Sequence, residues 1–332
     1  MSQQFLIIQT AFIGDVVLAT GIIEKLHHHY PEAKIDFMVR KGNEGLLINH
    51  PYLREIIIWE KQKNKLINLW KILQEVKKTR YDKVINVQRF MATGILTAFS
   101  GAKETVGFNK NPLSFLFTKR IEHVISINGN ARHEIERNND LVESFTDRVA
   151  FKPRLYPSAS DFNFVMQYKS TPYITISPAS VWFTKQYPKE KWLSFINSIP
   201  SHFNIYLLGG PGDRLLAEEI KSHSENSLVV NLCGNLSFLQ SAALMKDALM
   251  NYVNDSAPMH FTSAMNASVT AVYCSTVPVF GFGPLSDKKF IVEIQEPLYC
   301  RPCGLHGHRA CPESHFRCAH KINDEQLLET IR

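Results

Sequence analysis

The chain has 332 residues, of which 45% are hydrophobic and 20% are charged, a composition typical of a folded globular protein with a sizeable core. It contains no low-complexity segment and no apolar run of the roughly 18 to 20 residues that a membrane-spanning helix needs. The formal net charge of +6 favours anionic partners without selecting among nucleic acid, phospholipid and phosphorylated sugar. Because no basic segment leads into an apolar one near Met1, we expect a cytoplasmic protein.

The chain opens with a predicted strand, Phe5 to Ile8, followed by a turn and by a helical pattern from Val16. This order is typical of the first unit of a doubly wound parallel sheet. A dinucleotide-binding turn would need three glycines for a tight bend and a close approach to pyrophosphate, but this turn holds only Gly14. Asp15 stands where the helix opens, and its carboxylate would repel a phosphate there. The turn therefore argues against a nicotinamide oxidoreductase and predicts that something other than phosphate binds over it.

The alternation of strands and helices continues through two halves of the chain. In the first half we predict helices from Lys65 and Phe90 and strands at 35–39, 55–58 and 82–87. The stretch 151–172 contains prolines and serines without a sustained period and predicts a linker. In the second half we predict helices from Pro188, Asp213, Ser237 and Ser256 and strands at 173–176, 204–208, 228–230 and 268–273. We therefore expect an α/β fold of two doubly wound domains, 1–155 and 156–332, whose functional loops face a common cleft.

Two loops of the second half carry residues suited to a phosphate or a ribose. In SPASVWFTKQYPKEKW, Thr184 and Lys185 precede a helix, and a lysine in such a loop suits a phosphate, with a solvated lysine as the plain alternative. In LLGGPGDR, Gly209 and Gly210 would let the backbone approach a ligand, and Asp213 could accept hydrogen bonds from ribose hydroxyls. A simple turn with an aspartate helix cap explains the second loop equally well.

The loop NYVNDSAPMHF is the most informative. Asp255 and Ser256 end a strand and cap a helix whose first N–H groups, near Ala257, Met259 and His260, would bind a pyrophosphate. A capping role alone would also place Asp255 there. No D-x-D occurs in the chain, so the carboxylate clamp for a divalent metal that one large class of sugar transferases uses is absent. If a diphosphate leaves here, Lys185 and the helix end must carry its charge.

The six cysteines fall into two groups. Cys233 and Cys274 lie in apolar, strand-like contexts and are predicted to fill core space. The other four form C-x2-C-x7-C-x6-C, interleaved with histidines, which is dense enough for a structural tetrahedral zinc site: Cys300, Cys303, Cys311 and Cys318. Only the first pair has the close spacing usual in zinc sites, so reduced thiols or a labile disulfide are the alternatives. Nothing in the cluster suggests catalysis.

Taken together, five segments resemble, in order and spacing, the heptosyltransferases of glycosyltransferase family 9: TAFIGDVVLATG, SPASVWFTKQYPKEKW, LLGGPGDR, LCGNLSFLQSAALMKDA and VNDSAPMHFTSAM. The cysteine-rich tail and HEIERNNDLV also look like segments of that family, especially its lipopolysaccharide heptosyltransferase II branch. The D-S-x-P-M-H element is the most specific of them. In two places the chain departs from the family pattern, with Ala257 where glycine is common and Tyr187 where tryptophan is common.

The resemblance implies a GT-B fold of two Rossmann-like domains, the first binding the acceptor and the second binding the nucleotide sugar. It implies inverting transfer of heptose from ADP-L-glycero-D-manno-heptose, without a catalytic metal or another cofactor. Asp15 would be the general base, in the turn that contains Gly14, and Lys185 would balance the departing diphosphate. By the same resemblance the residues that bind substrate or donor are Gly14, Thr184, Gly209, Gly210, Asp213, Asp255, Ser256, Ala257, Pro258, Met259 and His260. His133, Glu134 and Arg137 fit the family pattern but receive no firm role beyond opening a helix.

The implied acceptor is a lipid-linked, anionic inner-core intermediate of lipopolysaccharide, which would hold the protein at the inner face of the inner membrane. The segment 108–120 is an apolar patch flanked by lysine and arginine, and we hypothesise that it touches the membrane. The alternative is a surface loop whose Phe115 and Phe117 pack into the core. Competing functions are a related transferase with another donor or acceptor, and a non-catalytic protein that binds sugar nucleotides. Nothing specific indicates nucleic-acid binding.

Overall fold

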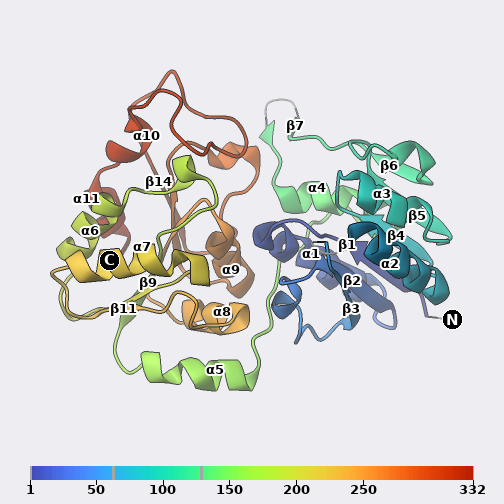
Figure 1. The fold of residues 1–332 in the computed structure, drawn as a ribbon, viewed down its shortest axis with the longest axis horizontal. Coiled ribbons are helices and arrows are strands. Elements are labelled where there is room, and N and C mark those ends of the chain that lie inside the picture. Colours follow the sequence, from blue (N-terminus) through green and yellow to red (C-terminus); the bar gives the residue numbers. More distant parts are fainter. Residues whose placement is uncertain (1, 62–63, 128–129, 332) are drawn as a thin grey trace. The chain divides into compact units, whose positions relative to one another are not determined.

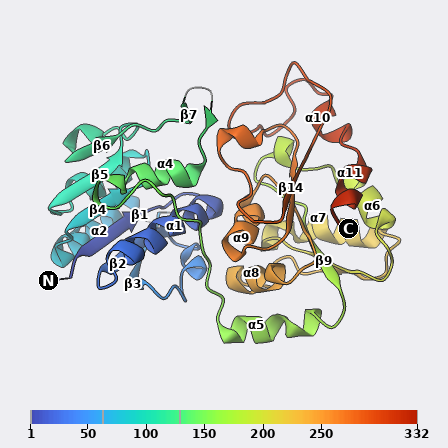
Figure 2. The same ribbon diagram turned by 180° about the vertical axis from the view of Figure 1, so that it is seen from behind.

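The computed structural model describes residues 2–61, 64–127 and 130–331, and the chain divides into two compact units, Met1–Tyr156 and Pro157–Arg332. Each unit contains a six-stranded parallel sheet with helices packed against it (Figures 1 and 2). Among the described helices, none combines the length and the apolar character needed to cross a membrane.

The first unit has the strand order β3-β2-β1-β4-β5-β6. Its strands are β1 (Gln4–Ile8), β2 (Lys34–Arg40), β3 (Leu53–Trp59), β4 (Lys83–Asn86), β5 (Glu104–Phe108) and β6 (Lys119–Ile121), with a small hairpin of β7 (Ser126–Ile127) and β8 (Asn130–Ala131). Its helices are α1 (Ile13–His29), α2 (Lys65–Thr79), α3 (Met91–Ala98) and α4 (Glu134–Asp140), with 3-10 turns η1 (Glu44–Leu46), η2 (Ser114–Leu116) and η3 (Glu143–Phe145).

The second unit repeats that order as β11-β10-β9-β12-β13-β14. Its strands are β9 (Tyr173–Ser177), β10 (Asn204–Leu207), β11 (Val229–Asn231), β12 (Asn251–Asn254), β13 (Val269–Tyr273) and β14 (Lys289–Glu293). Its helices are α5 (Ala159–Val165), α6 (Lys189–Ser198), α7 (Arg214–His223), α8 (Phe238–Lys246), α9 (Ala257–Met265), α10 (Arg317–His320) and α11 (Asp324–Leu328). Its 3-10 turns are η4 (Met166–Tyr168), η5 (Phe183–Lys185), η6 (Pro211–Asp213), η7 (Pro278–Phe280) and η8 (Glu329–Ile331).

Both sheets reverse their winding direction at the centre. In the first unit the chain moves outward from β1 to β2 and β3, then returns to place β4 on the other side of β1. In the second unit β9 and β12 stand in the same relation. Ligands of doubly wound sheets bind at such a reversal point, outside the carboxyl ends of the two strands. The loops after β1 and β4, and those after β9 and β12, are therefore the places where a site is expected.

Each sheet is covered because its strands are apolar on both faces. In β1, Leu6 and Ile8 pack with α2 and α3, whereas Phe5 points the other way and contacts Tyr30, which follows α1. In the second unit Trp192 and Phe195 of α6 are fully buried against the sheet. Burying a side chain of this size contributes about 1.5–3 kcal/mol, so these contacts fix the strand ends that carry the loops.

The predicted α/β architecture of two doubly wound sheets is confirmed, with three local differences. First, α1 begins at Ile13 rather than Val16, so Asp15 lies inside its first turn. Second, the predicted linker contains α5, which starts at a capping box in which Ser158 and Asp161 each accept the other's backbone N–H. Third, β5, β6 and β14 were not predicted; β6 and β14 are edge strands, and β6 has only three residues.

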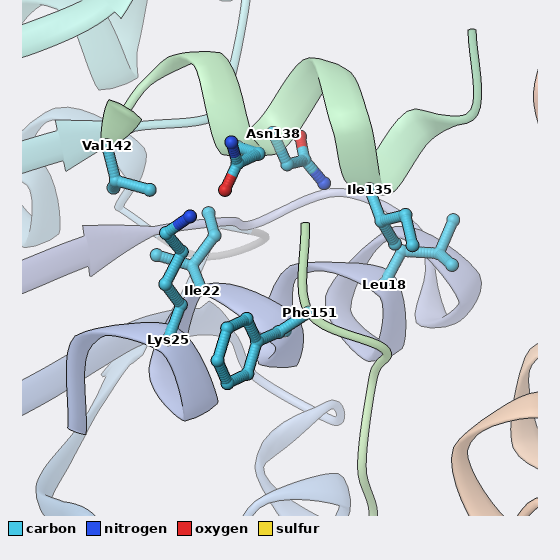
Figure 3. Close-up of a pocket in the computed structure, with 9 residues that line it drawn as sticks. Leu18, Ile22, Lys25, Ile135, Asn138, Val142 and Phe151 are labelled. Atoms are coloured by element: carbon cyan, nitrogen blue, oxygen red, sulfur yellow. The ribbon is translucent and has the colours of Figure 1, made fainter. Parts of the chain in front are cut away.

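A small cavity lies in the first unit between α1 and α4 (Figure 3). Its volume of about 10 Å³ is room for one water molecule. Both polar atoms of the Asn138 side chain are buried there and have no hydrogen-bond partner among the described residues. The cavity is thus a gap in helix packing that a water could fill, and it is too small for a nucleotide or a sugar.

Candidate active site

Asp15 lies at the start of α1, immediately after the loop that leaves β1. It is the acidic residue of the first helical turn and is partly exposed, whereas Gly14 beside it is buried. A carboxylate is stabilised at this end of a helix because the first N–H groups point toward it. The arrangement keeps a negatively charged oxygen at the carboxyl edge of the first sheet.

The loop that precedes Asp15 is fixed by a polar network at the reversal point of the first sheet. Thr10 follows β1 and donates through its hydroxyl to Oε1 of Gln88, which follows β4, at 2.8 Å. Lys61, after β3, donates from Nζ to the carbonyl oxygen of Thr10 at 3.0 Å and to its hydroxyl at 2.7 Å. Asn43 donates to the carbonyl oxygen of Ala11 at 3.0 Å. These bonds leave the loop little freedom, so they position Asp15.

Lys61 is the unusual cation of that network. Burial, together with the charges of Arg40 and Lys65, lowers the pKa of the Lys61 amine to about 8. Its ammonium also lies 4.7 Å from the centroid of the Trp59 ring. No local sequence pattern indicates this lysine, because only the fold brings the end of β3 beside Thr10 at the end of β1.

The reversal point of the second sheet holds an ion pair. Lys185 follows β9 and Asp255 follows β12, and Nζ of the lysine lies 2.7 Å from Oδ2 of the aspartate. The two side chains are only 14% and 8% exposed, so the pair is largely shielded from water. The same Asp255 oxygen accepts a hydrogen bond from the hydroxyl of Thr276 at 2.6 Å. An ammonium carries three N–H donors, so Lys185 keeps donors for an anionic ligand while Asp255 holds it in place.

Thr184, next to Lys185, is 1% exposed, and its hydroxyl oxygen accepts two hydrogen bonds. One comes from the hydroxyl of Ser275 at 3.0 Å and the other from the backbone N–H of His308 at 2.8 Å. Asn254 completes the loop's support: its side-chain oxygen accepts from Tyr187 N at 2.9 Å, and its amide donates to the Pro178 carbonyl at 2.8 Å.

The helix α9 begins directly after Asp255. Ser256 is its N-cap residue without a described side-chain cap bond, Pro258 stands in the first turn, and no acidic residue occurs in that turn. The side chains of Met259 and His260 are buried, and Met259 N donates to Ser256 O at 3.1 Å. Any contact of this turn with a ligand would therefore come from the remaining backbone and from Ser256 and Ala257, which are partly exposed.

The glycine loop after β10 has a structural explanation. Asp213 accepts the backbone N–H of Gly210 at 2.8 Å and so caps the turn η6. A Cβ at Gly209 would lie 2.8 Å from Oδ2 of Asp213 and 3.0 Å from Sγ of Cys233, so no side chain fits there. The structure thus contains the turn with an aspartate cap, the alternative explanation of this loop. Contacts of Gly209, Gly210 and Asp213 with a donor remain a prediction.

The remaining sequence candidates are the residues that open α4 and the cysteines. His133 caps α4, and Glu134 pairs with Arg137 at 2.7 Å in a largely buried bridge. All six cysteines are free, and Cys233 and Cys274 are buried in the core as predicted. Burial, reinforced by the neighbouring thiols of Cys303 and Cys311, raises the pKa of Cys318 to about 12. No group of three or more His, Cys, Asp or Glu side chains within the described ranges is arranged to hold a metal ion, so the four-cysteine metal site stays a prediction.

Comparison with known proteins gives a consistent result. The sequence pattern of glycosyltransferase family 9 (heptosyltransferase) matches residues 69–310, well over half of the chain. Lipopolysaccharide heptosyltransferase 3 from Escherichia coli is 23% identical over 290 residues, which cover 81% of this chain and 83% of that protein.

Two solved structures from E. coli share the fold. ADP-heptose lipopolysaccharide heptosyltransferase II has a TM-score of 0.82 at 19% identity, covering 99% of this chain and 97% of the other. Heptosyltransferase WaaC with ADP has a TM-score of 0.76 at 18% identity, covering 99% and 100%. The predicted GT-B class and the family resemblance are thereby confirmed: the chain belongs to glycosyltransferase family 9, the heptosyltransferases, and is a glycosyltransferase.

Proposed function

We propose that this protein transfers heptose from ADP-L-glycero-D-manno-heptose to an inner-core acceptor of lipopolysaccharide, with inversion and without a metal. The observation that carries the proposal is the shielded pair of Lys185 and Asp255 at the reversal point of the second sheet, in a chain of family 9. The similarity to lipopolysaccharide heptosyltransferases, one of them solved with ADP, supports the choice of donor and acceptor. The first unit then serves the acceptor and the second unit the donor.

On the donor side, Lys185 would place its ammonium on the diphosphate while Asp255 and Thr276 orient it. Negative charge grows on ADP as the bond from its terminal phosphate oxygen to the anomeric carbon breaks. A fixed cation in a shielded site stabilises that charge better than water does, because it needs no reorganisation during the reaction. The first turn of α9 adds the positive end of a helix and no acidic residue.

On the acceptor side, the Asp15 carboxylate would take the proton of the attacking hydroxyl as that oxygen bonds to the anomeric carbon. Attack from the face opposite ADP inverts the configuration, the electron pair of the broken bond leaves with ADP, and the proton stays on Asp15. General-base assistance of this kind contributes about 10²- to 10⁴-fold to the rate. The network around Thr10 holds the loop so that the carboxylate does not turn away.

A lipid-linked acceptor implies contact with the inner face of the inner membrane, and the segment 108–120 is our proposed contact. Phe115 is 66% exposed and Leu116 is also exposed, whereas Phe117 is buried. Of the flanking cations, Lys110 and Arg120 are exposed and Lys119 is partly exposed. Replacing all three cations with glutamate should abolish co-sedimentation with anionic liposomes, and unchanged co-sedimentation would rule this contact out.

The proposal is tested by measuring ADP release from ADP-L-glycero-D-manno-heptose in EDTA, with and without a truncated, phosphorylated inner-core acceptor. Turnover that requires the acceptor and survives chelation is the expected result. Turnover only with another nucleotide sugar or another acceptor would assign a related transferase instead. Donor binding with no turnover for any acceptor would favour a non-catalytic sugar-nucleotide binding protein, and absence of donor binding would overturn the heptose assignment.

A further inference from the structure

The cysteine-rich segment, residues 300–318, contacts the Lys185 loop directly. It runs from the region after β14 to α10, drawn orange to red in Figure 1. The backbone N–H of Thr184 donates to the carbonyl of His308 at 3.1 Å, and His308 N donates back to the Thr184 hydroxyl at 2.8 Å. These two bonds join positions 124 residues apart. The main chain of the segment is thus hydrogen-bonded to Thr184, the residue next to Lys185.

A second contact ties the same segment to the loop after β13. Cys303 N donates to the carbonyl of Ser275 at 2.8 Å, and Ser275 in turn donates to Thr184 through both its backbone N–H and its hydroxyl, at 3.2 and 3.0 Å. The next residue, Thr276, donates to Asp255, the partner of Lys185. Lys185 is therefore connected to the cysteine-rich segment through Thr184, and Asp255 is connected to it through Thr276, whose carbonyl accepts from Arg301.

The segment is anchored at both ends. At one end the guanidinium of Arg301 donates to the carbonyls of Cys274 and Thr276, each at 2.8 Å. At the other end Phe316 and Cys318 are buried in the core of the second unit. Because packed residues leave little free space, a displacement in the middle of a segment fixed at both ends shifts the residues that it contacts.

Gly307 is the point of closest contact. It adopts a left-handed conformation with φ +72, and a Cβ there would lie 2.8 Å from the hydroxyl of Thr184 and 3.3 Å from Cγ of Lys185. It would also lie 3.3 Å from the hydroxyl of Ser275. A contact of 2.8 Å forces a shift, and the three atoms belong to Lys185 itself and to Thr184 and Ser275, which lie beside it. Gly304 in the same segment has φ +68 and nothing within 4 Å of a Cβ.

We propose that the cysteine-rich segment positions Lys185, acting through Gly307 and His308 on Thr184, and so sets the affinity for a nucleoside diphosphate. Thr184 is then a positioning residue, since its hydroxyl is enclosed and already accepts two bonds. The role of Lys185 in binding diphosphate rests on the proposed function. The effect of the cysteine-rich segment on the backbone of residues 182–186 does not rest on that function, and it can be measured without any ligand.

The test compares Gly307→Ala with Gly304→Ala, since both substitutions put alanine in a left-handed conformation but only one meets the Lys185 loop. Binding of ADP and of adenosine to the whole protein is measured by calorimetry or competition. Gly307→Ala should weaken ADP binding about tenfold or more and adenosine binding less than about twofold, because only the phosphates meet Lys185. Gly304→Ala should leave both affinities within about twofold of the wild type. Equal losses for ADP and adenosine in Gly307→Ala would overturn the proposal.

Amide hydrogen exchange of the peptide 181–187 gives the ligand-independent measurement. Exchange should accelerate in Gly307→Ala and stay unchanged in Gly304→Ala; equal exchange in the two variants would overturn the proposal. Accelerated exchange in a protein whose wild type binds no ADP would uphold the positioning and overturn the proposed function alone. If Gly307→Ala does not fold, Thr184→Val replaces it, since valine keeps the volume but removes the acceptor of the His308 and Ser275 bonds. Wild-type exchange and ADP affinity in Thr184→Val would contradict the proposal.

Discussion

The two halves of this protein have the same strand order but opposite chemistry where the sheet reverses. In the first unit the helix α1 carries Asp15 inside its first turn, so a negative charge occupies the helix end. In the second unit α9 carries no acid in its first turn, and the acid just before it, Asp255, is paired with Lys185. In our proposal one topology thus provides both a place for a base and a place for an anion, and the position of a single carboxylate distinguishes the two.

The lysines at the two reversal points, Lys185 and Lys61, also differ in the charge of their partners. Lys185 faces a carboxylate at 2.7 Å, whereas Lys61 donates to the neutral carbonyl and hydroxyl of Thr10. A half-buried cation beside other cations is pushed toward its neutral form. The second unit therefore holds a lysine paired with a carboxylate, and the first unit holds a lysine whose pKa is lowered to about 8.

The largest expected effect comes from removing the carboxylate of the first unit. Asp15→Asn keeps the shape of the side chain but removes the proton acceptor, so kcat should fall about 10²- to 10⁴-fold. Steady-state ADP release with the phosphorylated inner-core acceptor measures it. ADP affinity is the control and should stay within about twofold, because Asp15 lies in the unit that does not bind the donor in our proposal. A kcat of Asp15→Asn within about tenfold of the wild-type value would mean that Asp15 is not the general base.

The next effect comes from the ion pair of the second unit. Lys185→Met should lower kcat/KM about 10²- to 10³-fold, as the loss of one fixed stabilising group does in other enzymes. It also leaves Asp255 shielded and unpaired, which should cost about 3 kcal/mol of stability. Chemical denaturation and ADP release measure the two effects separately.

Two further variants separate charge balance from ligand binding. In the double variant Lys185→Met/Asp255→Asn, stability should return toward the wild-type value, because the unpaired carboxylate of Asp255 has been removed. ADP affinity should stay low, because the ammonium of Lys185 is still missing. The matched control is Lys189→Met, which breaks an exposed pair with Glu219 and should leave stability close to that of the wild type. Recovery of ADP binding in the double variant would show that Lys185 acts only through the stability of the loop.

The contrast between the units also shows what could be predicted from the sequence. Apolar runs such as Phe5 to Ile8 and Tyr173 to Ile176 identify the central strands, and the residues just after them identify the site loops, since parallel strands end at one edge. The contacts of Lys61 with Thr10 and of His308 with Thr184 could not be predicted. They join main-chain and side-chain atoms 51 and 124 residues apart, and no local pattern encodes them.

The glycine loop of the second unit shows a further limit. Gly209 suggests close approach to a ligand, but the atoms that exclude a Cβ there belong to Asp213 and Cys233 of the protein itself. A sequence reports that a position must be glycine without reporting which neighbour requires it. That distinction needs coordinates.

A pair of glycine variants sharpens this point and has the third-largest expected effect. Gly209→Ala should destabilise the second unit by about 1–3 kcal/mol, since its Cβ would displace the carboxylate that caps η6. Gly212→Ala, in the same loop with nothing within 4 Å of a Cβ, should change stability by less than about 0.5 kcal/mol. Denaturation midpoints measure both. Equal stability of the two variants would mean that the loop moves freely to admit a side chain.

The smallest effect concerns the titrating lysine of the first unit. The pKa of Lys61 in the folded protein, about 8, lies below its ordinary value of 10.5, so between these pH values the unfolded chain binds more protons than the folded one. The free energy of unfolding therefore rises with pH across this window, because the folded protein loses the desolvated positive charge of Lys61. In Lys61→Met this contribution is absent.

The difference in unfolding free energy between wild type and Lys61→Met should accordingly shift in favour of the wild type by about 1 kcal/mol from pH 7 to pH 10, a figure reduced for solvent screening of a half-exposed amine. Urea denaturation at the two pH values measures it, and Lys78→Met, at an exposed position on α2, is the matched control. A shift of the opposite sign would mean that an anionic partner raises the pKa of Lys61, and the contrast between the two units would then rest on Asp15 alone.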